Sequence, residues 1–192
     1  KIVAPPPPWP RPQPDYPLLQ TGIKAVDLLT PLPRGGLVGH FSPLAGVGFS
    51  VLLAQYINSV IELHDGHALY LGLEAFDGFG AGLQLSWQEL GINPRVTYLF
   101  GSLQDSTGAR LQLLARGLAA AEAKRQAGQE TLLLVDSKLA ATPGVVTQLR
   151  ANGGDASTAS LPAAITTIIH GHHTVGALPE PFSDLTTLIT FH

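Results

Sequence analysis

Short apolar runs that alternate with helical patterns constrain the fold of this chain more than any other feature. Six runs have the length and composition of strands, at residues 37–41, 68–73, 95–100, 131–135, 164–170 and 185–191. Helical patterns lie among them at residues 23–29, 50–63, 83–90 and 107–126. Near-continuous apolar strands that alternate with helices are typical of parallel sheets. The sequence therefore predicts an α/β fold, with a mostly parallel sheet and helices on both faces.

The start of the chain differs from the rest because prolines dominate it. Residues 5–12 read Pro-Pro-Pro-Pro-Trp-Pro-Arg-Pro, which favours extended polyproline II conformation without internal hydrogen bonds. We expect residues 1–19 to form an extended arm laid over a neighbouring subunit, with residues 20–192 as the α/β domain. A PxxP ligand for an adaptor domain is the alternative.

The composition limits the classes of partner. Charged residues make up 13% of the chain, against roughly 25% in typical soluble domains, so we expect protein partners to cover much of the surface. A net charge of -3 argues against a nucleic-acid binder, and no apolar run reaches the ~18 residues of a membrane-spanning helix. Cysteine is absent, which excludes disulfides. Methionine is absent even at position 1, so we expect a processed or partial product.

A glycine-rich turn connects the first strand to the first long helix. It reads Ala45-Gly46-Val47-Gly48-Phe49-Ser50. Strand, glycine-rich turn and helix in that order are typical of the P-loop G-x-x-x-x-G-K-[ST], whose backbone N–H groups bind phosphates. Phe49 occupies the lysine position, and Pro43 the position of the first glycine. These six residues are therefore candidates for a vestigial nucleotide site that lacks its main positive charge.

Two further side chains could serve such a site as Mg²⁺ ligands. Ser50 keeps the hydroxyl of the motif, and Asp136 directly follows the apolar run 131–135, as a Walker-B carboxylate does. We expect both to bind Mg²⁺ only if nucleotide binds. In the structural alternative the glycines form a tight turn, Ser50 belongs to a helix cap, and Asp136 caps the next segment. Lys138 could replace the lost charge, or is simply solvated.

Residues 16–27 resemble the start of the nucleotide-binding domain of rotary ATPase head subunits. They read Y-P-L-L-Q-T-G-I-K-A-V-D, which is similar to the P-L-x-T-G-I-K-A-x-D signature of the α and β subunits of F-type ATP synthase. Residues 28–36 are closer to the β subunit, whose loop reads G-G-A-G-V-G-K-T. The resemblance spans residues 17–191 and implies a RecA-like P-loop NTPase domain.

The resemblance also implies a role for Glu74 and exposes departures from the family. Gly72-Leu73-Glu74 is similar to the segment that carries the β subunit's catalytic glutamate, although Ala75 replaces the arginine that follows it. Glu74 could polarise a water molecule, or be a strand-end carboxylate without a task. Within these 192 residues we find no counterpart of the family's β-barrel and helical C-terminal domains. We therefore expect that this chain does not serve as a normal catalytic subunit.

The cluster His170-Gly171-His172-His173 suggests a metal site, because imidazoles two residues apart share a strand face. No carboxylate nearby in the sequence completes a set of three ligands. We therefore interpret the cluster as a polar loop at the end of a strand.

Together these observations predict a catalytically inactive ATP synthase α/β-like pseudo-subunit with a structural or accessory role in a larger assembly. Its partners would be protein subunits, of ATP synthase type if the resemblance is functional, and no cofactor is expected. Losing one charge-assisted hydrogen bond, worth about 1.5–3 kcal/mol, slows phosphoryl transfer by about one to two decades. The alternative is a regulatory subunit that binds ATP or ADP with Mg²⁺, or a weakly active ATPase. The compartment stays open between an organelle matrix, such as the mitochondrial one, and the cytoplasmic side of a membrane complex.

Overall fold

The computed structural model describes residues 17–42, 49–74, 78–92, 95–153, 162–172 and 187–190. Within these ranges a six-stranded sheet has the order β5-β4-β6-β7-β3-β8. The strands are β3 (Leu37–Ser42), β4 (His67–Glu74), β5 (Val96–Ser102), β6 (Thr131–Asp136), β7 (Ile165–His172) and β8 (Thr187–Thr190). All neighbouring strands pair in parallel. The predicted α/β fold with a parallel sheet is confirmed, and it is consistent with a RecA-like α/β fold.

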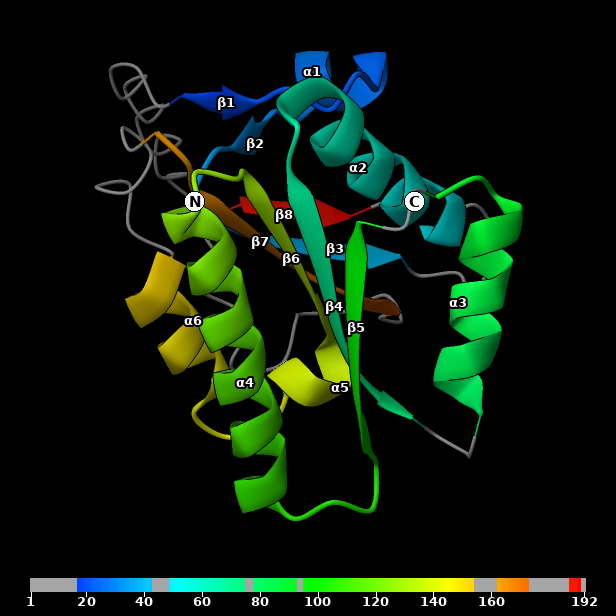
Figure 1. The fold of residues 1–192 in the computed structure, drawn as a ribbon, viewed down its shortest axis with the longest axis vertical. Helices are drawn as coiled ribbons and strands as arrows, with labels where there is room; N and C mark the ends of the chain where they lie inside the picture. The colour runs from blue at the N-terminus through cyan, green and yellow to red at the C-terminus, as the bar shows by residue number, and fades with distance from the viewer. Residues whose placement is uncertain are drawn as a thin grey trace, which may run out of the picture.

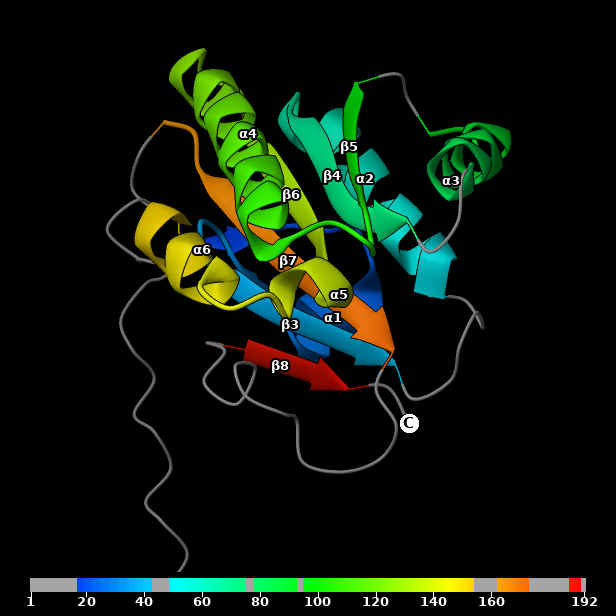
Figure 2. The same cartoon turned by 90° about the horizontal axis from the view of Figure 1, so that it is seen from below.

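Helices cover both faces of this sheet (Figures 1 and 2). One layer contains α1 (Lys24–Leu29), α2 (Phe49–His64) and α3 (Phe79–Glu89), and the other contains α4 (Thr107–Gln126), α5 (Ser137–Ala140) and α6 (Val145–Gly153). Side chains of the strands alternate between the layers. In β6, Leu132 and Leu134 pack with the α2 layer, whereas Leu133 and Val135 pack with the α4 layer. All six residues of β6 are buried, as the apolar run predicts.

Most elements lie where the sequence predicts them, but several differ. The helices α5 and α6 occupy a stretch in which the sequence predicts none, and α3 begins at Phe79 rather than at residue 83. The predicted loop 152–160 is wrong at its start, because Asn152 and Gly153 belong to α6. Residues 154–160 lie outside the described residues.

A short antiparallel hairpin precedes the sheet. It consists of β1 (Leu18–Leu19) and β2 (Leu32–Pro33), and the Pro17 carbonyl accepts a hydrogen bond from the Arg34 amide. Leu19 is buried in the core of the α2 layer. Residues 18 and 19, which the sequence assigns to the arm, therefore belong to the folded domain. The remaining arm residues, 1–16, lie outside the described part of the chain.

The T-G-I-K-A-V-D signature has a structural role in this fold. The Asp27 carboxylate accepts hydrogen bonds from the Thr21 amide at 2.9 Å, the Thr21 hydroxyl at 2.7 Å and the Gly22 amide at 2.9 Å. Gly22 has a φ of 71°, which side chains rarely tolerate. Ser59 of α2 donates to the Thr21 carbonyl and so ties the turn to the helix. These contacts fix the start of the domain against α2.

None of the helices in the described ranges combines the length and the apolar character that crossing a membrane would require.

Candidate functional site

The predicted site residues lie near the carboxyl ends of the parallel strands, where α/β sheets usually bind ligands. β3 ends at Ser42, and α2 begins at Phe49. A strand and then a helix therefore follow one another in the order that the sequence predicts. The connection itself, residues 43–48, lies outside the described residues, and with it Ala45, Gly46, Val47 and Gly48.

Phe49 and Ser50 are the first two residues of the 16-residue helix α2. The N-terminus of a helix presents backbone N–H groups and a partial positive charge, which favours anions. Ser50 is exposed there. This end of α2 therefore keeps backbone donors and a hydroxyl, while the residue in the lysine position has no charge to offer.

Asp136 caps a helix, as the structural alternative predicts. Its Oδ1 accepts a hydrogen bond from the Lys138 amide at 2.9 Å and lies 3.4 Å from the Ser137 hydroxyl, at the start of α5. Burial raises the pKa of Asp136, although the nearby Lys138 charge opposes the shift. The Lys138 side chain is exposed. A Mg²⁺ ion at Asp136 would have to share a carboxylate that already stabilises α5.

Glu74, the last residue of β4, also has a structural partner. Its Oε1 accepts a hydrogen bond from the Gly80 amide at 2.8 Å, in the first turn of α3. Its backbone carbonyl accepts from the Leu103 amide at 3.0 Å. Glu74 therefore stabilises the N-terminus of α3, which adds a third role to the two that the sequence leaves open.

A row of polar side chains crosses the sheet on the α2 side, and the sequence alone did not reveal it. In the strand register His170 of β7 lies between His40 of β3 and Asp136 of β6. All three are buried, with exposures of 0% for His40, 6% for His170 and 9% for Asp136. The alternation of the strands places them on the same face as Val38 and Leu134.

Two tyrosine rings lie against the histidines of this polar row, one from α2 and one from the neighbouring strand β4. The Tyr56 ring of α2 lies 5.6 Å from the His40 ring, and the Tyr70 ring of β4 lies 5.3 Å from the His170 ring. Burial raises the pKa of both phenols. Burial, reinforced by the neighbouring His170, lowers the pKa of His40 to about 4. The row therefore holds His40 neutral near physiological pH.

This geometry predicts acid lability. The unfolded chain protonates His40 near its ordinary pKa of 6.5, whereas the folded chain does so only near 4. Stability is therefore lost as the pH falls from about 6.5 to about 4, by about 3 kcal/mol for this group. Asp136 titrates in the opposite sense because its pKa is raised. Urea unfolding at several pH values should show the loss in the native chain and a smaller loss in His40→Leu. Equal losses in both proteins would contradict the assignment.

His170 lies in β7, as the strand predicted over residues 164–170 requires, but the predicted loop after it is wrong at Gly171 and His172. Both belong to β7, which continues two residues beyond its predicted end. A Cβ atom on Gly171 would meet the Ser137 hydroxyl at 2.0 Å, so α5 packs directly on this part of the strand. His173 lies outside the described residues. In the described ranges no three or more His, Cys, Asp or Glu side chains are grouped so that they could hold a metal ion.

A scan against protein-family models finds none that matches this chain. The resemblance to rotary ATPase head subunits therefore rests on the motifs of the sequence alone.

Proposed function

We propose that this chain is a catalytically inactive relative of the ATP synthase α and β subunits, with a structural or accessory role in a larger protein assembly. The observation that carries the proposal is the position of Phe49. It is the first residue of α2, directly after the strand and connection of the P-loop pattern. An aromatic ring there cannot supply the charge stabilisation on which phosphoryl transfer depends.

The two acidic candidates support the same proposal. Asp136 is engaged by the Lys138 amide and Glu74 by the Gly80 amide, so both carboxylates hold helix ends. A carboxylate that caps a helix contributes about 0.5–2 kcal/mol to stability. Their retention in this chain therefore needs no catalytic explanation.

The second candidate function is a regulatory subunit that binds ATP or ADP with Mg²⁺ but does not hydrolyse it. One observation favours it: Ser50 is exposed at the N-terminus of α2, beside backbone donors that do not depend on the missing lysine.

Nucleotide titration distinguishes these functions. We expect no heat in isothermal titration with Mg·ATP or Mg·ADP, and no phosphate release above background. Phe49→Lys should raise the affinity for Mg·ATP about tenfold or more, because a charge-assisted hydrogen bond contributes about 1.5–3 kcal/mol. Ser50→Ala in the Phe49→Lys background is the control, and it should reverse part of the gain. Heat without turnover in the native chain would favour the regulatory subunit. Turnover that Glu74→Gln abolishes would identify an ATPase.

A further inference from the structure

The strand β5 forms one edge of the sheet and is only half-buried over most of its length. β4 is the one strand paired with it in the described part of the chain. The first six residues of β5 are half-buried and Ser102 is exposed, whereas the first seven residues of β4 are buried. Figure 1 views the sheet from this edge, with α4 on one side of β5 and α3 on the other.

The backbone of β5 has a defined outward side. The Arg95 carbonyl accepts from the Ala68 amide, and the Leu103 amide donates to the Glu74 carbonyl, so these two odd-numbered positions face β4. In a parallel ladder, alternate residues point their N–H and C=O groups to the same neighbour. The even-numbered residues therefore direct theirs away from the sheet. The Ser102 amide, which is one of them, donates to Asp105 Oδ2 at 2.8 Å.

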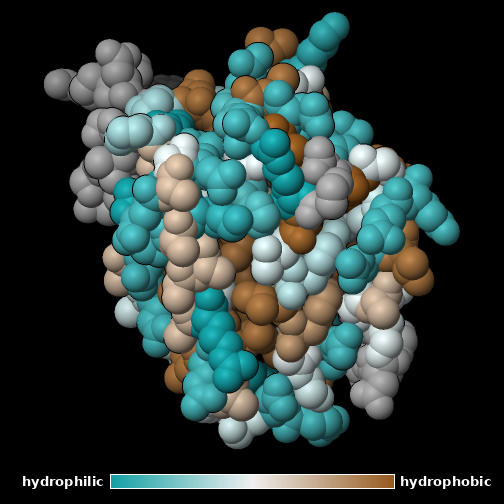
Figure 3. Space-filling model, in the orientation of Figure 1, coloured by the Kyte–Doolittle hydropathy of each residue, from teal (hydrophilic) through white to brown (hydrophobic). Residues whose placement is uncertain are grey.

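The other outward groups belong to Val96, Tyr98 and Phe100. Natural sheets usually protect such an edge with lysine, proline or an inward-pointing charge. The β5 sequence Val-Thr-Tyr-Leu-Phe-Gly-Ser contains none of these residues. Figure 3 shows apolar side chains gathered along this edge, between α4 and α3. The edge therefore has both the backbone groups and the apolar surface that strand pairing uses.

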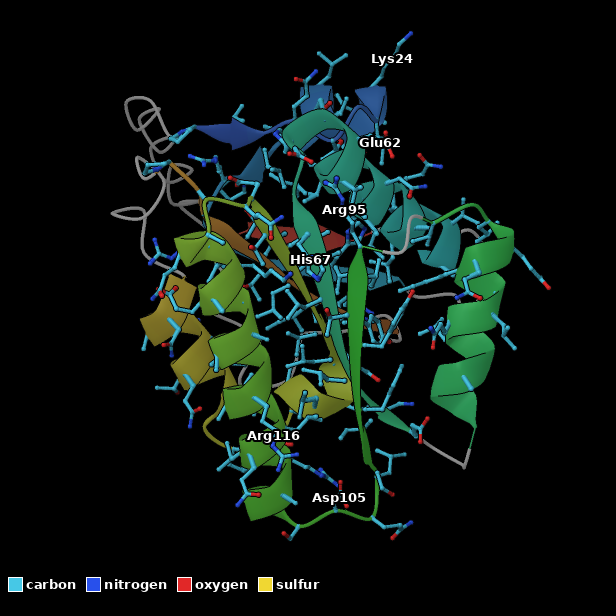
Figure 4. All side chains as sticks on the ribbon, viewed as in Figure 1. Lys24, Glu62, His67, Arg95, Asp105 and Arg116 are labelled. Carbon is cyan, nitrogen blue, oxygen red and sulfur yellow. The ribbon has the colours of Figure 1, made fainter. Side chains whose placement is uncertain are left out.

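The two ends of the edge carry opposite charges. Arg95 precedes β5, pairs with Asp65 and keeps 47% of its side chain exposed. Asp105 follows the strand, and its hydrogen bond to the Ser102 amide holds the carboxylate beside the last residue of β5. Figure 4 shows Arg95 and Asp105 at opposite ends of the strand. An antiparallel copy of β5 would bring Arg95 of each chain toward Asp105 of the other.

We propose that two copies of this chain pair through β5, antiparallel and around a two-fold axis perpendicular to the sheet. The surface is then self-complementary, as a two-fold interface requires, and the sheet continues from one copy into the other. A parallel arrangement would bring like charges together. The dimer goes beyond the proposed function, because it involves no nucleotide and no second kind of subunit.

Sedimentation across a dilution series tests the dimer. The mass should rise with concentration from 20.2 kDa toward twice that value. Amide exchange measured by NMR in the same series gives an independent readout. Exchange at Val96, Tyr98 and Phe100 should slow as the dimer forms, while Thr97 and Leu99, which already bond to β4, should change little. A mass that stays at 20.2 kDa, together with amide exchange that does not depend on concentration, would overturn the proposal. The partner of the β5 edge would then be a different protein.

Charge reversal tests the antiparallel arrangement. Arg95→Asp and Asp105→Arg should each weaken dimerisation about tenfold, because each change places like charges together twice in the interface. The double variant, Arg95→Asp with Asp105→Arg, should recover most of the lost dimer affinity. Arg125→Asp on α4 is the matched control, since it makes the same change of charge away from β5, and it should leave the dimer intact. Thermal unfolding of every variant checks that the monomer still folds. Failure of the double variant to recover would overturn the antiparallel pairing.

Discussion

Replacing Arg34 with methionine should lower the free energy of unfolding by about 3–5 kcal/mol, because it leaves a buried carboxylate without its cation. Arg34 binds Glu130 through two hydrogen bonds, Nε to Oε1 at 3.0 Å and Nη2 to Oε2 at 2.6 Å. The Glu130 side chain is 7% exposed. Urea unfolding monitored by circular dichroism measures the loss.

The size of this effect follows from the number of segments that the pair connects. Arg34 also donates to the Pro162 carbonyl at 3.1 Å, and Glu130 accepts from the Ala164 amide at 3.3 Å. The Glu130 carbonyl accepts from the His67 amide at 2.8 Å. The ion pair therefore holds together the start of β3, β4, β6 and β7, at the end of the sheet away from the candidate site.

An exposed ion pair in the same chain provides the control for Arg34→Met. Arg125 and Glu122 pair on the surface of α4, with side chains 25% and 40% exposed. Arg125→Met should lower stability by less than about 1 kcal/mol, as surface pairs do. The double variant Arg34→Met with Glu130→Met should recover part of the loss of Arg34→Met, because it removes the buried charge as well. Equal losses for the buried and the exposed arginine would contradict this account.

The central elements could be predicted because their own residues determine them. The run 131–135 is apolar at every position apart from Thr131, and β6 is buried on both faces. The short strands β1 and β2 could not be predicted, since two residues cannot show a period. The helix α6 did leave a signal, because the apolar positions Val145, Val146 and Leu149 lie on one helical face and are buried. Pro143 and Gly144 stand just before it, and a Pro-Gly pair is more typical of a turn than of a helix start.

The polar row could not be predicted because it depends on the strand order. His40 and His170 are far apart in the sequence, and only the pairing of β3 with β7 brings them level. A single histidine in an apolar run gives no spacing from which to infer a partner. Asp136 and Glu74 both hold helix ends, but only the role of Asp136 was within reach of the sequence. A cap for the segment after Asp136 was one of the sequence alternatives, whereas the contact from Glu74 to Gly80 needed the position of α3.

Trp87→Ala should lower the free energy of unfolding by about 3–5 kcal/mol, because it empties a buried site in the α2 layer. Trp87 of α3 is 1% exposed. Its ring meets Tyr70 edge-on at 5.3 Å and lies 6.0 Å from Tyr98. Most other described side chains of α3 are exposed, including Leu85 at 61%. Trp87 is therefore the main apolar anchor of this helix.

Trp87→Phe is the matched variant, because it keeps an aromatic ring in the same place. Trp87→Phe should lower the free energy of unfolding clearly less than Trp87→Ala does. It also removes the indole Nε1, a buried donor that has no hydrogen-bond partner in the described structure. Chemical unfolding gives the difference in stability between the two variants. Similar losses for alanine and phenylalanine would show that α3 does not depend on this ring.

The loss of the Trp87 ring should also change how much Glu74 contributes to the stability of the fold. Glu74 holds the first turn of α3 through Gly80, and Trp87 holds the same helix two turns later. If α3 detaches in Trp87→Ala, the Glu74 carboxylate loses the partner it stabilises. Glu74→Ala, which removes the acceptor, should then cost less stability in that background than in the native chain, which a double-mutant cycle measures. Additive losses of stability would mean that Glu74 acts independently of α3. A structural role would then no longer account for this carboxylate, and a catalytic one would have to be tested.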